Sequence, residues 1–175
     1  MGKCDNLKYA AKYNSPIGEM IIYADDIGIT GAWFDSCRFL PKETVGVERN
    51  VTPIIDEAIR WFDIYFGGAE PDFTPPLHPI GTPFQTEVWD ILRTVRYGKT
   101  TTYGEIASEL ARRRGIKKMS AQAVGNAVGR NKISVILPCH RVIGADGTLV
   151  GYGGGTDKKE YLLNLEGVRF GRKKV

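Results

Sequence analysis

Cysteine is scarce in this chain. Only three occur among the 175 residues, namely Cys4, Cys37 and Cys139. Such an odd and sparse set does not build a disulfide framework, so we expect a reducing compartment that keeps thiols reactive. A zinc site would have to combine Cys4, Cys37 and His78, and no CxxC or HxxxH spacing supports it. Because structural zinc sites usually have paired close ligands, the sequence argues against a bound metal.

Long hydrophobic runs are also missing. No apolar stretch approaches the roughly 18 residues of a membrane span, and residues 1–5 open no apolar stretch of the signal-peptide type. At 42% apolar and 25% charged residues, the composition is that of an ordinary globular protein. We therefore expect a cytoplasmic protein without a membrane partner, built from one domain or two small ones.

Charge is divided unevenly along the chain. Residues 1–89 hold 7 Lys and Arg against 13 Asp and Glu, a net charge of −6, whereas residues 90–175 hold 17 against 7, a net charge of +10. A basic domain attracts phosphate backbones. The alternative is a solvated surface that serves solubility, and charge by itself does not decide between the two.

The first half alternates strands and a helix. Turn residues within residues 7–34 divide that stretch into three strands of a meander. Residues 53–66 show a helical apolar stripe that begins at Pro53 and ends before Gly67. Four prolines in residues 69–82 mark a linker or extended connection. We place the domain boundary there, which predicts domains at residues 1–80 and 81–175.

The second half is predicted to be mostly helical. Thr82–Gln85 is a capping box that opens a helix expected to end at Gly98. A second capping box, Thr102–Glu105, opens the next helix, and the basic turn Arg112–Lys118 follows it. Ser120 caps a third helix that runs to about Gly129. Two short helices around a basic turn resemble a helix-turn-helix.

Small residues dominate the third helix. They leave its surface thin, which permits a close approach to another backbone, and they are Ala121, Ala123, Gly125, Ala127 and Gly129. Tight packing inside the domain is one interpretation, and insertion into a DNA groove is the other. The neighbouring basic turn favours DNA.

The run Ile136–Val142 carries the strongest chemical signal. Most free cysteines are small buried hydrophobes, but Cys139 lies between Pro138 and His140, and Arg141 adds a cation that favours a thiolate. Adjacent residues on a strand point to opposite faces, so either the backbone bends here or a water bridges thiol and imidazole. An acidic partner usually fixes the imidazole tautomer, and Glu166 is the candidate.

Pro138–Val142 resembles the motif of the O6-alkylguanine-DNA alkyltransferase family. The resemblance covers residues 81–167 closely and the N-terminal half loosely, through Ser15–Gly18 and Ile27–Gly31. Further matching segments are Gly81–Gln85, Tyr97–Gly98, Thr102–Ala107, Ala123–Gly125, Gly147–Leu149, Gly151–Tyr152 and, in the late helix Asp157–Glu166, Leu162–Gly167.

The resemblance implies a fold and an activity. It implies a small α/β, ribonuclease-H-like N-terminal domain followed by a mostly α, winged-helix-like C-terminal domain. It implies a methylated-DNA–protein-cysteine methyltransferase that moves an alkyl group from O6 of guanine, or from O4 of thymine, to Cys139. Each molecule would act once, as a monomer on double-stranded DNA containing O6-alkylguanine, without metal or cofactor. Because a stacked base hides its O6 substituent, the base must be flipped out.

The resemblance also assigns roles to residues. His140 would deprotonate Cys139 through a water, Glu166 would orient His140, and Asn131 would brace the segment before Cys139. Tyr103 would help extrude the nucleotide, and Tyr152 would line the base pocket. The remaining expected contacts to DNA or substrate are Gln122, Ala123, Gly125, Arg130, Arg141, Val142 and Gly153. Many family members have an arginine where this chain has Gln122, and Gly153–Gly155 would leave an open pocket rim that admits larger alkyl groups.

Three other functions use the same features. A non-catalytic DNA-lesion binder of this fold should lack the nucleophile. A cysteine hydrolase would need an oxyanion hole, which the sequence does not identify. A winged-helix transcription factor would use Cys139 only structurally.

Overall fold

The computed structural model describes residues 8–37, 40–41 and 48–171. It divides the chain into two compact units. The first contains the chain up to Ile80 together with Lys132–Ile136, and the second contains Gly81–Asn131 and the chain from Leu137 onward. Cys4 and the predicted strand start at Leu7 lie outside the described residues.

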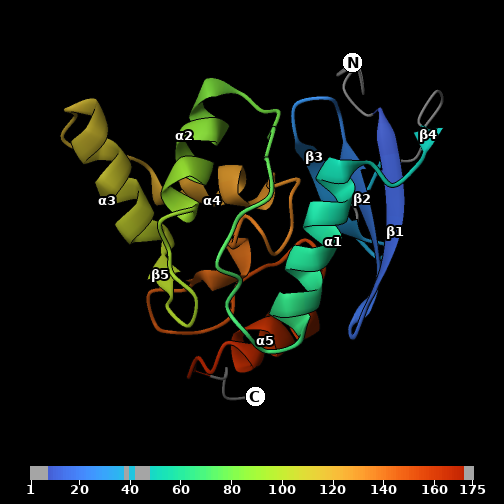
Figure 1. Ribbon diagram of the computed structural model, residues 1–175. Helices are drawn as coiled ribbons and strands as arrows, with labels where there is room; N and C mark the ends of the chain where they lie inside the picture. Colours follow the sequence, from blue (N-terminus) through green and yellow to red (C-terminus); the bar gives the residue numbers. More distant parts are fainter. Residues whose placement is uncertain (1–7, 38–39, 42–47, 172–175) are drawn as a thin grey trace. The chain divides into compact units, whose positions relative to one another are not determined.

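A four-stranded sheet forms the first unit, in the order β3-β2-β1-β4 (Figure 1). Its strands are β1 Tyr9–Ser15, β2 Gly18–Ala24, β3 Ile29–Phe34 and β4 Glu48–Arg49. The first three are antiparallel neighbours, which confirms the predicted meander, and β4 pairs with β1 in parallel. The first hairpin is tighter than predicted because Ser15 pairs with Gly18, whose φ of 124° suits glycine.

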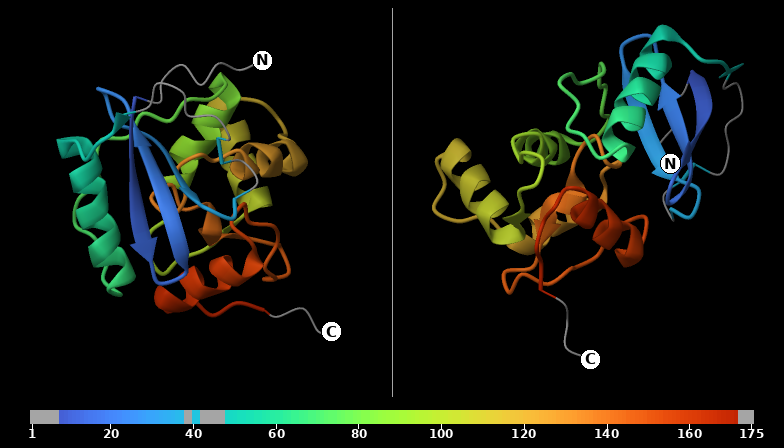
Figure 2. Two further views of the ribbon diagram at one scale, coloured as in Figure 1. Left: turned by 90° about the vertical axis from the view of Figure 1, so that its right-hand side faces the viewer. Right: turned by 60° about the horizontal axis from the view of Figure 1, so that its bottom comes forward.

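Helix α1, Pro53–Phe66, packs along this sheet and has the predicted bounds (Figure 2). The Thr52 side chain caps it by accepting a hydrogen bond from the backbone N–H of Ile55. Ile55, Ala58 and Phe62 are fully buried, as the apolar stripe predicts. The first unit is thus an α/β layer built around an apolar core.

The proline-rich connection, residues 69–82, pairs with β3 at the edge of the first unit's sheet. Ile29 donates its N–H to Pro76 at 2.7 Å, and His78 donates its N–H back to Ile29 at 2.8 Å. The His78 ring meets Asp25 with Nδ1 and Oδ2 2.6 Å apart. Extended backbone without its own partners pairs with an available strand edge, so this segment is an ordered connection.

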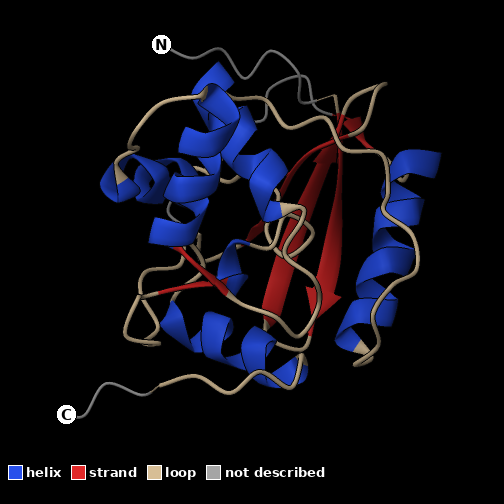
Figure 3. Cartoon of the chain, turned by 90° about the vertical axis from the view of Figure 1, so that its left-hand side faces the viewer, coloured by secondary structure: helices blue, strands red, loops and turns tan. Residues whose placement is uncertain are grey.

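Helices dominate the second unit (Figure 3). Its elements are α2 Pro83–Leu92, β5 Thr101–Thr102, α3 Tyr103–Arg114, α4 Ala121–Gly129, the 3₁₀ turn η1 Cys139–Arg141, β6 Val142–Ile143 and α5 Thr156–Leu165. Both predicted capping boxes are confirmed, with reciprocal bonds between Thr82 and Gln85 and between Thr102 and Glu105. The predicted combination of an α/β unit and a mostly helical unit is therefore confirmed.

Helix α2 ends earlier than predicted. The apolar spacing favours a helix up to Gly98, but α2 stops at Leu92. There the chain tightens into i to i+3 bonds, and the Thr94 hydroxyl donates to the Ile91 carbonyl at 2.7 Å. A side-chain donor that satisfies a terminal carbonyl competes with the next helical turn. No described helix is long and apolar enough to cross a membrane.

Candidate active site

Two sharp turns lead the chain into Cys139. The N–H of Ile136 donates to the Ser134 carbonyl across Val135, whose φ of 72° is strained for a β-branched residue. The N–H of Cys139 then donates to the Leu137 carbonyl at 2.8 Å, across a proline whose φ is −82°. Proline suits that inverse γ-turn because its ring restricts φ to similar values.

Cys139 itself opens the 3₁₀ turn η1. The strand rule for adjacent side chains therefore does not apply, because the backbone bends at the cysteine, one of the two alternatives that the sequence left open. The Cys139 side chain is nearly buried, with 9% of the residue exposed. After η1 the chain continues as β6, which pairs in parallel with β5.

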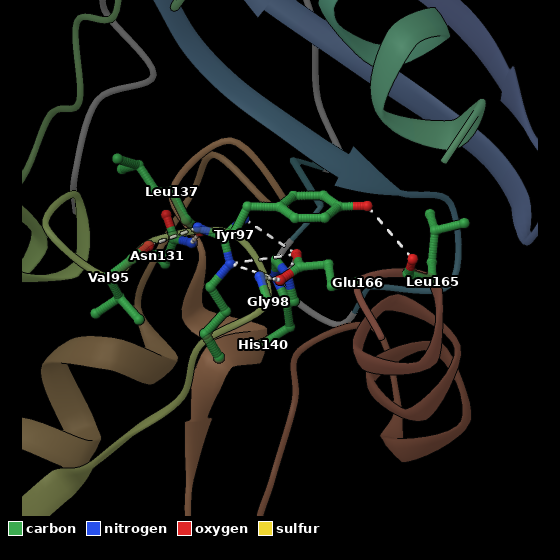
Figure 4. Close-up of polar contacts among 9 residues, drawn as sticks. Val95, Tyr97, Gly98, Asn131, Leu137, His140, Leu165 and Glu166 are labelled. Carbon is green, nitrogen blue, oxygen red and sulfur yellow. Dashed lines mark hydrogen bonds and ion pairs between the residues drawn. The ribbon is translucent and has the colours of Figure 1, made fainter. Parts of the chain in front are cut away.

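The Asn131 amide connects the cysteine to the segment before it. Its Nδ2 donates to the Leu137 carbonyl at 2.8 Å and to Cys139 Sγ at 3.1 Å. The same nitrogen thus donates to two acceptors, the Leu137 backbone carbonyl and the Cys139 sulfur (Figure 4 shows Asn131 beside Leu137). A donor aimed at sulfur favours the thiolate, which is the nucleophilic form of cysteine.

His140 and Glu166 form a buried pair. Both side chains are 0% exposed, and His140 Nε2 lies 2.7 Å from Glu166 Oε1. The same carboxylate accepts the backbone N–H of Gly98 at 3.0 Å and the guanidinium of Arg141, with Nε 2.9 Å from Oε2 (Figure 4). Its position is therefore fixed by three donor residues from two separate segments, the turn η1 and the backbone at Gly98.

The charges of this pair follow from their surroundings. Burial raises the pKa of Glu166, but the donors His140 and Arg141 more than offset it and hold the pKa at about 2. Burial lowers the pKa of His140, and the nearby carboxylate opposes this only in part. Because Arg141 already neutralises Glu166, we assign a neutral imidazole at pH 7 with its proton on Nε2. Its Nδ1 then carries a lone pair and can act as a base.

Arg141 is an internal anchor. Besides Glu166, its Nη1 donates to the Val95 carbonyl at 2.6 Å, and the guanidinium lies 5.8 Å from the centre of the Tyr97 ring. Only 8% of the residue is exposed. The structure places this predicted substrate contact inside the second unit, where its charge holds Glu166.

Tyr103, at the start of α3, lies within electrostatic range of Cys139. Its hydroxyl is 3.5 Å from the Val150 carbonyl, and burial raises its pKa, with a further contribution from the charge of a Cys139 thiolate. A Cβ added at Gly125 would lie 3.5 Å from the tyrosine ring. The small residue at 125 thus brings α4 close to Tyr103.

Helix α4 has one packed face and one exposed face. Val124, Ala127 and Val128 are buried, and the Trp89 indole donates to the Ala127 carbonyl at 2.9 Å. The other predicted contacts are placed differently: Gln122 and Arg130 are exposed, Ala123 and Gly125 are half-buried, Val142 is buried in β6, and Tyr152 (half-buried) and Gly153 (exposed) follow in the next loop. Small residues therefore serve internal packing and also leave an open outer face.

The arginines of the basic turn form ion pairs with glutamates, so the turn carries less unbalanced positive charge than its sequence suggests. Arg112 and Arg113 both pair with Glu109, and Arg114 pairs with Glu87. Its two lysines are exposed and help to line an open hollow of about 780 Å³ between α3 and the start of α4. The cations that face this hollow are Arg112, Lys117 and Lys118.

Sequence reasoning missed Lys159. This residue of α5 is 0% exposed, and its Nζ donates to the Val142 and Val150 carbonyls at 2.5 and 2.7 Å. The available signal is a helical stripe, because Lys159 and Glu166 occupy the same spacing as the buried Leu162 and Leu163. Among the described residues, no three His, Cys, Asp or Glu side chains gather as a metal site would need.

Comparison with known proteins matches each half of the chain to a domain family. Residues 8–79 match the model of the 6-O-methylguanine DNA methyltransferase ribonuclease-like domain, and residues 83–168 match that of its DNA binding domain. The chain belongs to the 6-O-methylguanine DNA methyltransferase family.

Relatives in this family cover most of the chain. The methylated-DNA–protein-cysteine methyltransferase of Haemophilus influenzae is 37% identical over 93% of this chain and 88% of its own. That of Methanosarcina barkeri is 48% identical over 87% of this chain and 92% of its own. The crystal structure of Mycobacterium tuberculosis OGT in complex with DNA matches with a TM-score of 0.77 and 36% identity, covering 90% and 92% of the two chains.

Proposed function

We propose that this chain repairs DNA by moving an alkyl group from O6 of guanine to Cys139, each molecule acting once. The Asn131–Cys139 contact beside the buried His140–Glu166 pair carries the proposal, because it combines a nucleophile, a base and an orienting carboxylate. The thiolate attacks the alkyl carbon, the carbon–oxygen bond breaks as the carbon–sulfur bond forms, and the released guanine takes up a proton. The product is a stable thioether, so the thiol is not regenerated.

In the proposed reaction, each residue around Cys139 has a separate role. His140 takes the thiol proton through one water, and the tautomer with Nε2 protonated leaves Nδ1 for that task. Glu166 selects this tautomer and orients the ring. Asn131 stabilises the developing thiolate, and Arg141 holds the carboxylate in place.

Double-stranded DNA containing O6-alkylguanine is the proposed partner. The relative from Mycobacterium tuberculosis was crystallised with DNA, and the exposed face of α4 presents Gln122 and Arg130. Tyr103 assists extrusion of the base, and Tyr152 and Gly153 line the pocket that receives it. O4-alkylthymine is a second substrate of the same chemistry. The chain acts as a monomer in the cytoplasm.

The hollow beside the basic turn supports a phosphate contact. Lys117 and Lys118 face it, and the capped N-terminus of α4 begins at its edge. Positive charge next to the groove-facing helix attracts the DNA backbone independently of sequence.

Incubation with a duplex carrying O6-methylguanine, followed by peptide mass spectrometry, tests the proposal. We expect one methyl group per molecule, on the peptide that contains Cys139, and none in the Cys139→Ser variant. A label on Cys4 or Cys37 contradicts the assignment. A lesion binder or transcription factor would bind without gaining mass, and a hydrolase would release product repeatedly.

A further inference from the structure

A basic segment, residues 169–174, follows helix α5, and the proposed chemistry does not use it. Residues 167–175 hold four Lys and Arg and no Asp or Glu. The match to the family's DNA binding domain ends at residue 168, so these cations lie beyond it. Arg169 and Gly171 are exposed, whereas residues 172–175 lie outside the described part of the chain and contribute through their sequence alone.

Backbone contacts hold the start of the basic segment against a loop of the second unit. Gly171 donates its N–H to the Gly147 carbonyl at 2.9 Å, and it forms an isolated parallel bridge with Thr148. Nearer to α5, Val168 donates its N–H back to the last turn of that helix at 2.9 Å. Gly171 is therefore a fixed point, and Arg172 is joined directly to it.

The loop that receives Gly171 leads to the residues expected to meet DNA. Two residues after Thr148, the Val150 carbonyl lies 3.5 Å from the Tyr103 hydroxyl. The Tyr103 ring in turn lies 3.5 Å from where a Cβ at Gly125 of α4 would be. The basic segment thus starts one short loop away from the exposed face of α4, the surface that the proposed function gives to DNA.

Acidic groups beside the basic segment are already engaged. Asp146, in the same loop, accepts hydrogen bonds on Oδ1 from the N–H and the hydroxyl of Thr148. The Glu166 carboxylate holds Arg141, with Nε 2.9 Å from Oε2. Arg169 forms no ion pair with a described residue, unlike the three arginines of the basic turn. The positive charge of the segment is therefore available to a partner.

The spacing of these cations fits a nucleic-acid backbone. Residues 172–174 are three consecutive cations that extend over at most about 11 Å. Phosphates of one DNA strand follow each other roughly every 3.4 Å along the helix axis, so a run of this length meets several of them. The proximity to α4 favours DNA over an acidic protein partner.

We propose that the basic segment binds the phosphate backbone of duplex DNA beside the contact made by α4. This inference rests on the proposed function, which supplies DNA as the partner. Gly171 keeps the cations close to the duplex, and each phosphate that they neutralise releases counterions. Phosphate contacts carry no sequence information, so the segment adds affinity for any duplex.

Removal of the three cations tests the proposal by the salt dependence of binding. The variant carries Arg172→Gln, Lys173→Gln and Lys174→Gln. Binding to duplex is measured by fluorescence anisotropy at several salt concentrations, in a Cys139→Ser background that prevents reaction. The slope of log affinity against log salt should fall by about two to three, since each phosphate contact contributes about 0.9.

A matched control removes the same charge from the first unit. It carries Lys8→Gln, Lys12→Gln and Arg60→Gln, and its slope should equal that of the parent. An unchanged slope in the variant without residue 172–174 cations, or an equal fall in the control, overturns the proposal. Circular dichroism establishes that each chain is folded.

A substitution at Gly171 tests the anchor. Gly171→Pro removes the N–H that donates to Gly147 and should weaken duplex binding several-fold, because the cations are no longer held in place. It should have no effect once the three cations are gone. Gly171→Ala keeps the N–H, with its Cβ 3.4 Å from the Gly147 oxygen, and serves as the control. Equal weakening with and without the cations shows that the pairing supports only the fold and overturns the anchoring role.

The unmodified chain gives a further readout. Lysine acetylation, mapped by peptide mass spectrometry, should decrease at Lys173 and Lys174 when duplex is bound, and it should persist at Lys8 and Lys12. Equal acetylation of Lys173 and Lys174 with and without duplex contradicts the proposal.

Failure of this inference and failure of the proposed function are distinguishable. If a methyl group reaches Cys139 from DNA while the slope and the acetylation pattern stay unchanged, the proposed function stands and the basic segment has no role in binding. If the slope falls and the two lysines are protected but no methyl group is transferred, the segment binds DNA and the alkyltransferase assignment fails.

Discussion

The two units bury different kinds of side chains. Among the described residues of the first unit, the buried polar side chains are Asp25, Thr30 and Ser134, set in an apolar core. Those of the second unit are Asn131, His140, Arg141, Lys159 and Glu166. Burying charges costs several kcal/mol per ion before compensation. A cluster of four ionisable groups in one small unit is therefore a sign of chemistry, whereas the first unit follows the ordinary rule for a stable core.

Two regions within the second unit also differ, namely the surroundings of Cys139 and the exposed surface formed by α4 and the basic turn. Cys139 is contacted by Asn131 and lies next to the paired His140 and Glu166, whereas the outer face of α4 and the lysines of the basic turn are exposed. The first region is preorganised before substrate arrives, which limits the cost of reaching the reactive geometry. In the proposed function, the second makes its contacts only when DNA binds. Substitutions in the two regions should therefore affect different steps.

Glu166→Gln should have the largest effect. In this variant a neutral amide replaces the charged carboxylate that accepts the hydrogen bond from His140, so the imidazole is held less firmly. General-base assistance is typically worth about 10²–10⁴-fold in rate. Single-turnover transfer should slow by that factor for both alkylated duplex and the free base, because the chemical step itself is affected. Glu160→Gln on the same helix serves as the control. A Glu166→Gln chain that reacts at the parent rate contradicts the assigned role.

The double substitution Lys117→Ala and Lys118→Ala should weaken duplex binding. Each phosphate contact contributes about one unit to the slope of log affinity against log salt, so the slope should fall by about two. Binding is measured by fluorescence anisotropy at several salt concentrations, in a Cys139→Ser background that prevents reaction. Lys12→Ala together with Lys8→Ala, in the first unit, should leave the slope unchanged. Equal slopes in all chains would place the DNA contact elsewhere.

Gln122→Arg should give a gain of several-fold. Flipping a base costs a few kcal/mol of unstacking and unpairing, which the protein must offset with contacts in the vacated space. Arginine reaches further than glutamine and adds charge in the phosphate field. Transfer from alkylated duplex should become faster or binding tighter, and reaction with the free base should barely change. If both substrates respond equally, Gln122 acts on the thiol or the fold.

Asp25→Asn should change stability and leave chemistry untouched. Burial raises the pKa of Asp25, but the N–H donors of Gly28 and Ile27 together with His78 bring it below its ordinary value. A lowered folded pKa means that this stabilisation is complete above the unfolded pKa and is lost as pH falls through the folded one. We expect a loss of about 1.5–3 kcal/mol at neutral pH, as for a hydrogen bond to a charged group.

Thermal melts from pH 7 to pH 3 check this prediction. The parent should lose stability across the acidic range, and Asp25→Asn should show a smaller dependence on pH. The exposed Asp35 offers the control Asp35→Asn, which should melt like the parent. A reduced transfer rate in Asp25→Asn at temperatures where it is folded would show that the first unit takes part in the chemistry.

Local signals in the sequence predicted the elements well. Thr82 and Thr102 start helices because capping residues act within one turn, and the bounds of α1 followed from Pro53 and a regular apolar stripe. The predicted end of α2 was wrong because the Thr94 hydroxyl satisfies the Ile91 carbonyl, a contact that the spacing of apolar residues does not reveal. The linker interpretation of residues 69–82 missed the pairing with β3, because a strand edge elsewhere in the chain supplied the partner.

The sequence alone determined the family, and it predicted Cys139 as the nucleophile with His140 and Glu166 as its partners, because the run Pro138–Val142 and the glutamate at the end of the late helix are local patterns. The tertiary structure decided how the charges are shared. It placed Arg141 on Glu166, which leaves His140 neutral, and it buried Lys159 among backbone carbonyls. Protonation states depend on burial and on neighbours brought together from distant segments, and neither quantity is encoded in spacing along the chain.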